Sequence, residues 1–449
     1  MYYLMPNDKM TDFPLTCSTT GVYHVPEISK DSAERTVSLL RANHDAFHVF
    51  FNFKGYHNHQ VHYLLTAYAL GANPAQLQSA FDTNISYQRP RIPVDEAIVR
   101  KLSNERFFKS LIGNDTYFND YTAFFQRKFE AQGWQKVVND YLFSRTELAD
   151  DLLVRLHAGI IHPLIHFGFG IEFQQPPIIA EALAQAVCHN NFFGPFLFEA
   201  EQLAKSRTNE ECPPLLDLMK EIRQDPSLYD KNYWDGGNTL LDKILADAPQ
   251  RVIEIASKWR VDVQDLELRT AEMMNVNAWM AGAAQRRDKE VKLDFFFIHS
   301  VNCSIFFSAI NAQSWLSDEN KARLLEWKVR MDILQYASRL APELYNDEVV
   351  NYKPRESGRS WASIIETTNK ITYDDGHISK LVRALAHGSK VCGPYEERQE
   401  LSARFPLKAS GWLQIANMAI DTTKAPTVPT RWVRGAGGAQ NWETFGSRL

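Results

Sequence analysis

The chain has 449 residues, of which 45% are hydrophobic, 12% aromatic and 23% charged, a composition that excludes a disordered, collagen-like or disulfide-rich protein. The chain has 49 Lys and Arg residues against 54 Asp and Glu, a net charge of −5. This charge argues against nucleic-acid or anionic-membrane partners, because both bind proteins that carry dense basic patches. Five scattered cysteines, an N-terminus without a signal-peptide pattern and the lack of an apolar run of about 18 residues predict a cytoplasmic protein that does not enter membranes.

Helical periodicity dominates the sequence and strand alternation is rare, so the predicted fold is all-α. No linker interrupts the middle of the chain, and residues 1–449 are expected to form one large helical domain with irregular ends at about 1–30 and 422–449. Asn58 is the expected N-cap of the first clear helix, and Asp374 or Asp375 that of the last. In chain order, the clearest helices are expected at 59–70, 146–167, 176–190, 266–286, 293–309, 318–340 and 376–386.

Six of the 13 histidines lie in two short windows, and helical geometry shows which of them could converge. At about 100° per residue, His162 and His166 are ~40° apart and share a face, and His59 and His62 are ~60° apart. His157 lies ~140° from His162, and His57 precedes its helix, so neither is expected in a shared site.

His299 and His377 also occupy apolar helical segments, where a histidine is costly to bury without a partner. The clustered histidines therefore indicate either a metal site or a buried polar network. Imidazole ligands suit Zn, Cu, Fe and Ni, but neither HExxH nor an HxD or HxE spacing is present among these histidines.

Lys380 follows His377 by three residues and shares its helix face. A buried neutral amine could take up CO₂ and ligate a metal as a carbamate, because burial disfavours the ammonium form. The alternative is an ordinary ion pair with Asp374 or Asp375.

Four segments that carry these residues resemble the questin oxidase-like family, whose members serve fungal aromatic-polyketide pathways, including Baeyer–Villiger-type oxidations of anthraquinones. The two long histidine-bearing blocks are specific to that resemblance. The segments are Asn52–Ala72, His157–Ala186, Lys292–Val301 and Asp374–Gly388.

The chain is most similar to a branch of that family described as atypical non-heme iron dioxygenases, in which four histidines and a carboxylated lysine hold Fe(II). The resemblance implies that Lys380 and His377 are ligands from one helix. His62, His299 and one of the pair His162 and His166 would be single ligands from three further helices, with His59 as an alternative to His62. If His62 is the ligand, His59 and Asp375 would not bind the metal but would contact its ligands.

The predicted function is therefore an iron-dependent dioxygenase that uses O₂ to cleave a ring of an anthraquinone-type polyketide in fungal secondary metabolism. Two alternatives stay open: an NADPH-dependent Baeyer–Villiger monooxygenase without iron, and a zinc-dependent hydrolase or lyase. The glycine patterns at Gly168–Gly170 and Gly435–Gly438 lack a complete GxGxxG and a preceding strand, which argues against a bound dinucleotide domain. Five aromatic residues near the predicted ligands could contact a flat substrate or simply pack the core: Phe167, Phe169, Phe295, Phe306 and Phe307.

Overall fold

The computed structural model describes residues 13–207, 209–228, 240–423 and 431–448. Their contacts divide the chain into an N-terminal unit, Met1–Phe192 with Ile371–Gly376, and a C-terminal unit, Phe193–Lys370 with His377–Leu449. Within the described ranges the chain forms helices and four isolated β-bridges, without a strand, and the all-α prediction is confirmed. The expectation of a single domain stays a prediction.

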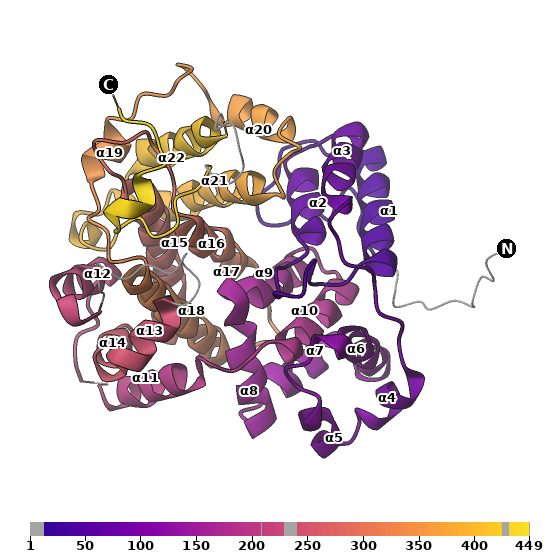
Figure 1. Cartoon of the computed structure of the whole chain (residues 1–449). Helices are drawn as coiled ribbons and strands as arrows, with labels where there is room; N and C mark the ends of the chain where they lie inside the picture. The colour runs from indigo at the N-terminus through magenta and orange to yellow at the C-terminus, as the bar shows by residue number, and fades with distance from the viewer. Residues whose placement is uncertain (1–12, 208, 229–239, 424–430, 449) are drawn as a thin grey trace. The chain divides into compact units, whose positions relative to one another are not determined.

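The N-terminal unit is built around the apolar helix α10, which packs against α9, α6 and α8, while α1, α2 and α3 pack on one another (Figure 1). Two prolines open α10, where their missing N–H groups cost nothing. The helices are α1 Lys30–Ala46, α2 Gln60–Ala69, α3 Pro74–Ile85, α4 Glu96–Lys101, α5 Glu105–Ser110, α6 Phe118–Gln132, α7 Trp134–Val138, α8 Glu147–Leu156, α9 Ala158–Glu172 and α10 Pro176–Cys188.

The C-terminal unit has a core of three mutually packed helices, α15, α16 and α21, and α22 runs beside α21 (Figure 1). Its helices are α11 Gly194–Ser206, α12 Leu215–Gln224, α13 Leu240–Asp247, α14 Pro249–Ser257, α15 Leu266–Ala283, α16 Phe295–Ser304, α17 Phe306–Asn311, α18 Asp318–Ser338, α19 Asn346–Val350, α20 Trp361–Asn369, α21 His377–Glu396 and α22 Ala409–Thr422.

Most expected helices are present with small shifts at their ends. The N-cap of α2 is His59 rather than Asn58, although the Asn58 side chain still accepts a hydrogen bond from the Gln60 N–H at 2.9 Å. The last expected helix is longer than predicted, since α21 continues to Glu396.

Two expected helices are each divided. The segment 146–167 forms α8 and α9, which meet at a bend of 98°, because Gly159, Ile160 and Ile161 adopt left-handed φ angles of 54–55°. Pro163 does not cause this bend: it lies just after the left-handed residues, where a proline is tolerated. The segment 293–309 divides into α16 and α17 at Ile305, which keeps helical φ and ψ values of −57° and −33°.

The described parts of the two ends are largely irregular, as expected. Residues 13–29 contain no helix, and residues 431–448 contain only the short 3₁₀ helix Ala439–Trp442. Asp294 ties this last segment to the start of α16, since one carboxylate oxygen caps the helix at the Phe296 N–H and the other accepts from Gly435 and Ala436 at 2.7 and 2.8 Å. Residues 1–12 and 424–430 lie outside the described ranges.

None of the described helices is by itself long and apolar enough to cross a membrane, and only the bent pair α8 and α9 meets that criterion of length and composition when joined.

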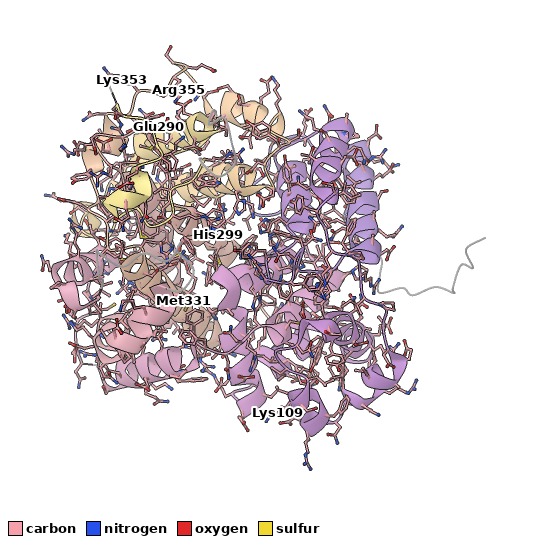
Figure 2. The ribbon with its side chains drawn as sticks, viewed as in Figure 1. Lys109, Glu290, His299, Met331, Lys353 and Arg355 are labelled. Carbon is pink, nitrogen blue, oxygen red and sulfur yellow. The ribbon has the colours of Figure 1, made fainter. Side chains whose placement is uncertain are left out.

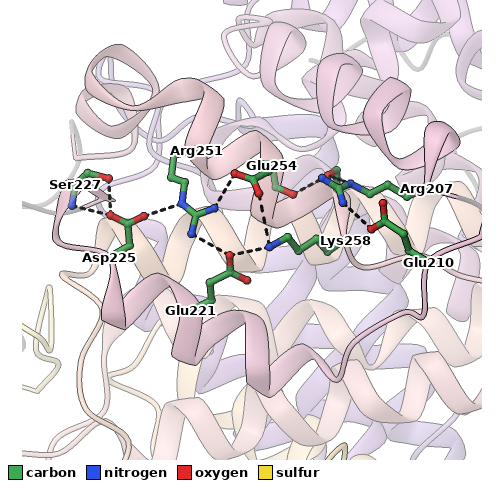
Figure 3. Close-up of polar contacts among 9 residues, drawn as sticks. Arg207, Glu210, Glu221, Asp225, Ser227, Arg251, Glu254 and Lys258 are labelled. Atoms are coloured by element: carbon green, nitrogen blue, oxygen red, sulfur yellow. Dashed lines mark hydrogen bonds and ion pairs between the residues drawn. The ribbon is translucent and has the colours of Figure 1, made fainter.

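An ion-pair network joins α12 and α14 around Arg251 (Figure 3). The guanidinium group donates to Asp225 at 2.6 Å, to Glu254 at 2.7 Å and to Glu221 at 2.9 Å. Lys258 also donates to Glu221, at 2.7 Å. These charges hold two helices of the C-terminal unit together at its partly exposed surface.

Candidate functional site

In the N-terminal unit, the two predicted histidine pairs face each other across α2 and α9. The Nε2 atoms of His59 and His162 are 2.8 Å apart, and His62 Nε2 lies 3.1 Å from His166 Nδ1. All four side chains are buried. The HxxH spacing at the start of α2 therefore matches the HxxxH spacing on α9, because each histidine of one helix has a ring nitrogen close to a ring nitrogen of the other.

The bend between α8 and α9 positions the α9 pair. After the left-handed residues, His162 stands in the first turn of the helix and its Nδ1 lies 2.6 Å from the Gly159 carbonyl oxygen. A carbonyl only accepts, so this Nδ1 carries the proton and the His162 Nε2 presents a lone pair toward His59.

Two carboxylates hold the outer nitrogens of the other imidazoles. Asp375 Oδ2 lies 2.8 Å from His59 Nδ1. Glu181, on α10, bridges two rings, with Oε2 at 2.9 Å from His166 Nε2 and Oε1 at 2.5 Å from His44 Nδ1. Burial alone would raise the pKa of Glu181, but the hydrogen bonds and charges of His166 and His44 outweigh it and lower that pKa to about 2.

Asp375 reaches His59 because the segment Ile371–Gly376 is fixed against α2 and α3. The Tyr63 hydroxyl donates to the Ile371 carbonyl at 2.5 Å, and the Asn84 amide donates to the Asp374 carbonyl at 3.4 Å. Gly376 closes the segment with φ at +90°.

His57 was not expected in a shared site, but it lies beside one of the predicted histidines. His57 lies before α2, but its ring stacks on His162 with centroids 4.1 Å apart, and its Nε2 is 2.8 Å from His189 Nε2. Burial lowers the pKa of His189 to about 4, with the Arg155 charge adding to the effect. His157 turns back to its own helix, with Nδ1 at 2.8 Å from the Leu153 carbonyl.

In the C-terminal unit, His299 on α16 meets His377 at the start of α21, and their Nε2 atoms are 3.3 Å apart (Figure 2 labels His299). The His299 Nδ1 lies 2.6 Å from the Phe295 carbonyl, so its proton is on Nδ1 and its Nε2 offers a lone pair. The Phe295 ring packs against both imidazoles, with centroids at 4.7 and 5.1 Å.

Lys380 is 3% exposed and lies one turn beyond His377 on the same helix. Its carboxylation stays a prediction. Of the five aromatic residues singled out in the sequence, Phe295 contacts two histidines and Phe169 stacks on His62 at 5.1 Å. The other three are core residues, no more than 1% exposed: Phe167, Phe306 and Phe307.

The spacing of the paired nitrogens fits a transition-metal ion. Two ligand atoms bound at about 2.1 Å are roughly 3.0–3.4 Å apart for angles at the metal between 90° and 109°. The pairs His62–His166 and His299–His377 fall in this range at 3.1 and 3.3 Å. The His59–His162 pair, at 2.8 Å, is slightly closer and brings together two lone pairs if both rings are neutral, so it needs a shared proton or a cation.

Glu181, His44 and His189 were missed in the sequence, although Glu181 left a signal. It is a single carboxylate in the apolar helix PPIIAEALAQAVC, and a buried charge on such a face requires a partner. Its partners come from α1 and α9, so spacing along the chain could not identify them.

Comparison with known proteins gives consistent matches over most of the chain. A sequence model of the questin oxidase-like family matches residues 56–385. The Baeyer-Villiger oxidase ptaJ of Pestalotiopsis fici is 40% identical over 425 residues, which cover 94% of this chain and 95% of that protein. The questin oxidase of Aspergillus fumigatus is 38% identical over 434 residues, covering 94% and 96%, and the Baeyer-Villiger oxidase mdpL of Emericella nidulans is 40% identical over 417 residues, covering 91% and 92%.

The relatives are named as oxidases and monooxygenases, so the chain is an oxidoreductase that uses O₂. The alternative of a zinc-dependent hydrolase or lyase is therefore set aside. The family model and the extent of these alignments lead to one conclusion: the chain belongs to the questin oxidase-like family.

Proposed function

We propose that this protein is an oxygenase that acts on an anthraquinone-type aromatic polyketide and that it uses iron(II) held by its buried histidines. The observation that carries the iron proposal is the His299–His377 pair, in which the Nε2 atoms are 3.3 Å apart and the Phe295 carbonyl fixes the His299 tautomer. The names of the relatives support the substrate class, since two are questin oxidases.

The proposed ligands are those predicted from the sequence. In the C-terminal unit they are His299, His377 and Lys380, whereas the candidates in the N-terminal unit, His62 and one of His162 and His166, stay a prediction. Lys380 would supply the anionic ligand as a carbamate. Iron(II), when bound, supplies the one-electron chemistry that lets dioxygen react with a closed-shell aromatic substrate.

The remaining contribution of the chain is to orient and shield the imidazoles. Asp375 and Glu181 fix ring tautomers through charge-assisted hydrogen bonds, so that the inner nitrogens keep their lone pairs. Phe295 covers one side of both His299 and His377 and limits the access of water there.

A second candidate function is an NADPH-dependent Baeyer–Villiger monooxygenase without iron, which the names of several relatives favour. In that reaction one atom of O₂ enters the substrate as an ester oxygen and the other leaves as water, with two electrons from NADPH. A dioxygenase would instead place both oxygen atoms in the ring-cleaved product of a hydroquinone and would need no reductant in that step.

Metal analysis of the purified full chain, reconstituted anaerobically with Fe(II), tests the iron proposal directly. We expect about one iron per chain and loss of iron and O₂ uptake together in His299→Ala, with the helical circular dichroism unchanged. His387→Ala is the matched control, because His387 is also a buried histidine of the C-terminal unit but is bonded to the Ser308 hydroxyl at 2.8 Å. A metal-free wild type that consumes O₂ normally would refute iron dependence.

Turnover of a hydroxyanthraquinone panel under ¹⁸O₂ then separates the two candidate reactions. Two labelled atoms in the product without NADPH consumption support the dioxygenase. One labelled atom with one NADPH oxidised per turnover supports the monooxygenase. No O₂ uptake with any member of the panel would contradict the proposed substrate class.

A further inference from the structure

Arg434 lies close to the His299–His377 pair. Its guanidinium carbon is 4.2 Å from the centre of the Phe295 ring, which packs against the two imidazoles with centroids at 4.7 and 5.1 Å. The guanidinium carbon is therefore no farther than about 9 Å from the centre of either imidazole. All four residues belong to the C-terminal unit.

The backbone before Arg434 is paired with the start of α16. The Val433 N–H donates to the Leu293 carbonyl at 3.1 Å, and the Phe295 N–H donates to the Val433 carbonyl at 2.8 Å. These two hydrogen bonds place Arg434 beside Phe295, although the two residues are far apart in the sequence.

The backbone after Arg434 is held by a buried carboxylate. The N–H groups of Gly435 and Ala436 both donate to one oxygen of Asp294, at 2.7 and 2.8 Å, and the Asp294 side chain is fully buried. The position of Arg434 is thus fixed before a ligand binds, which lowers the entropic cost of using its side chain for recognition.

The positive charge of Arg434 has no anionic partner within the described ranges. Its side chain is exposed, and its guanidinium forms neither a hydrogen bond nor an ion pair with the residues that the structure describes. Arg287 of the same unit also lies over an aromatic ring, that of Tyr345 at 4.3 Å, but it donates to both oxygens of Asp347 at 2.8 and 2.9 Å. The stacked cation of Arg434 is therefore available to an anion, whereas that of Arg287 is already paired.

A guanidinium group held over a phenyl ring suits a flat phenolic ligand. It stays charged, has five N–H donors and no acceptor, and stacks on aromatic faces. A hydroxyanthraquinone offers a planar ring system and phenol oxygens that ionise readily, because the quinone carbonyls withdraw electrons from the ring. A ligand of three fused rings can place one oxygen on Arg434 and its opposite ring beside the imidazoles.

We infer that Arg434 is a substrate-binding residue that recognises an ionised phenol oxygen of the aromatic polyketide, with Phe295 as its aromatic support. The inference rests on the proposed function for the substrate class, and it requires neither iron nor a choice between the two candidate reactions. The protein should therefore bind a free phenol more tightly than the corresponding methyl ether.

Binding of 2-hydroxyanthraquinone and 2-methoxyanthraquinone to the full chain, followed by quenching of tryptophan fluorescence, tests this role without turnover. We expect Arg434→Gln to bind the hydroxy ligand about tenfold more weakly, an effect between that of an exposed ion pair and that of a buried charged hydrogen bond. The methoxy ligand should bind within about twofold of its affinity for the wild type, since it has no charge to lose. Arg434→Lys keeps the charge but not the planar fork, so its affinity for the hydroxy ligand should be intermediate.

Arg287→Gln is the matched control, because it removes an exposed, stacked arginine whose charge is already paired. Its affinity for both ligands should stay within about twofold of the wild type. Equal loss of both ligands in Arg434→Gln, or the same loss of the hydroxy ligand in Arg287→Gln, would overturn the inference.

The absorption spectrum of the bound hydroxy ligand gives a second measurement, since ionisation of its phenol moves the absorption band to longer wavelength. A tenfold preference for the phenolate corresponds to about one pH unit, so half-ionisation should occur about one pH unit higher in Arg434→Gln than in the wild type. The same half-ionisation pH in both proteins would overturn the inference.

The failure of the inference and that of the proposed function give different results. A wild type that binds neither ligand would refute the proposed substrate class and the inference with it. A wild type that binds both ligands, but no more tightly than Arg434→Gln, would refute only the role of Arg434. Weaker binding of NADPH by Arg434→Gln, with the hydroxy ligand unaffected, would assign Arg434 to a nucleotide phosphate and would also overturn the inference.

Discussion

Gly376, at the end of the segment that carries Asp375 to His59, has no room for a side chain. Its φ is +90°, a conformation that costs an L-residue about 1–2 kcal/mol. A methyl group there would lie 2.8 Å from Tyr63 Cβ, 2.9 Å from Cγ and 3.1 Å from Cα. A different Tyr63 rotamer cannot relieve contacts at Cβ and Cα, so the backbone must shift.

Gly376→Ala should therefore destabilise the N-terminal unit by more than its backbone conformation alone explains. Overpacking of this kind costs about 1–3 kcal/mol in addition to the cost of the left-handed φ. Gly55→Ala isolates the backbone term, since Gly55 belongs to the same unit, has φ at +76° and has open space around the position of an added methyl.

Thermal unfolding followed by circular dichroism measures the difference between the two variants. For a unit of about 200 residues, 1 kcal/mol changes Tm by about 2–4 °C. Gly376→Ala should thus melt at least about 2 °C below Gly55→Ala. Equal melting temperatures would show that the segment moves away from Tyr63 without cost, and the account of how Asp375 is held at His59 would be wrong.

Three further predictions concern the C-terminal unit. Burial, with nearby cations, lowers the pKa of His387 from 6.5 to about 3. Below pH 6.5 the His387 side chain is therefore protonated in the unfolded chain but stays neutral in the folded chain. The free energy of unfolding should fall by about 1.4 kcal/mol for each pH unit below pH 6.5. His387→Gln should flatten the decline of Tm between pH 6 and 4, and an unchanged slope would contradict this. Arg251→Ala should cost about 1 kcal/mol at low salt and less in 1 M NaCl, because its ion pairs are partly exposed; a cost independent of salt would contradict the electrostatic explanation. Asp294→Asn should expose the amides of Gly435 and Ala436, because one carboxylate oxygen accepts hydrogen bonds from both. Hydrogen exchange at these two amides should become at least about tenfold faster, while exchange in α18 stays unchanged.

The helices could be predicted because their signals are local. Two prolines open α10, Ser317 caps α18 and Asp294 caps α16, and each of these contacts lies within a few residues in the sequence. The division of 146–167 could not be predicted in the same way. Ile160 and Ile161 are β-branched and disfavour left-handed φ values, so local preference favours the continuous helix that the structure does not contain.

In the candidate site, too, the features with local signals could be predicted and the others could not. The spacings within His59–His62 and within His162–His166 are local, and they indicate which rings share a side of a helix. The contacts that fix the tautomers are not local: Asp375 is 316 residues from His59, and Glu181 is 137 residues from His44. His57 was excluded because it precedes α2, but tertiary packing brings its ring onto His162.

The left-handed turn at the start of α9 shows why the site needs this unfavourable backbone. Two isoleucines at positive φ cost roughly 2–4 kcal/mol together, and such strain persists only where the surrounding contacts require it. Those contacts are imidazoles: the Gly159 carbonyl holds His162 Nδ1 at 2.6 Å, and a Cβ on Gly159 would lie 2.6 Å from His189 and 2.8 Å from His57. A side chain at Gly159 would therefore displace the rings packed around His162, and a continuous helix would remove the carbonyl that fixes the His162 tautomer. The strain is concentrated in Ile160 and Ile161, next to the histidines whose geometry depends on it.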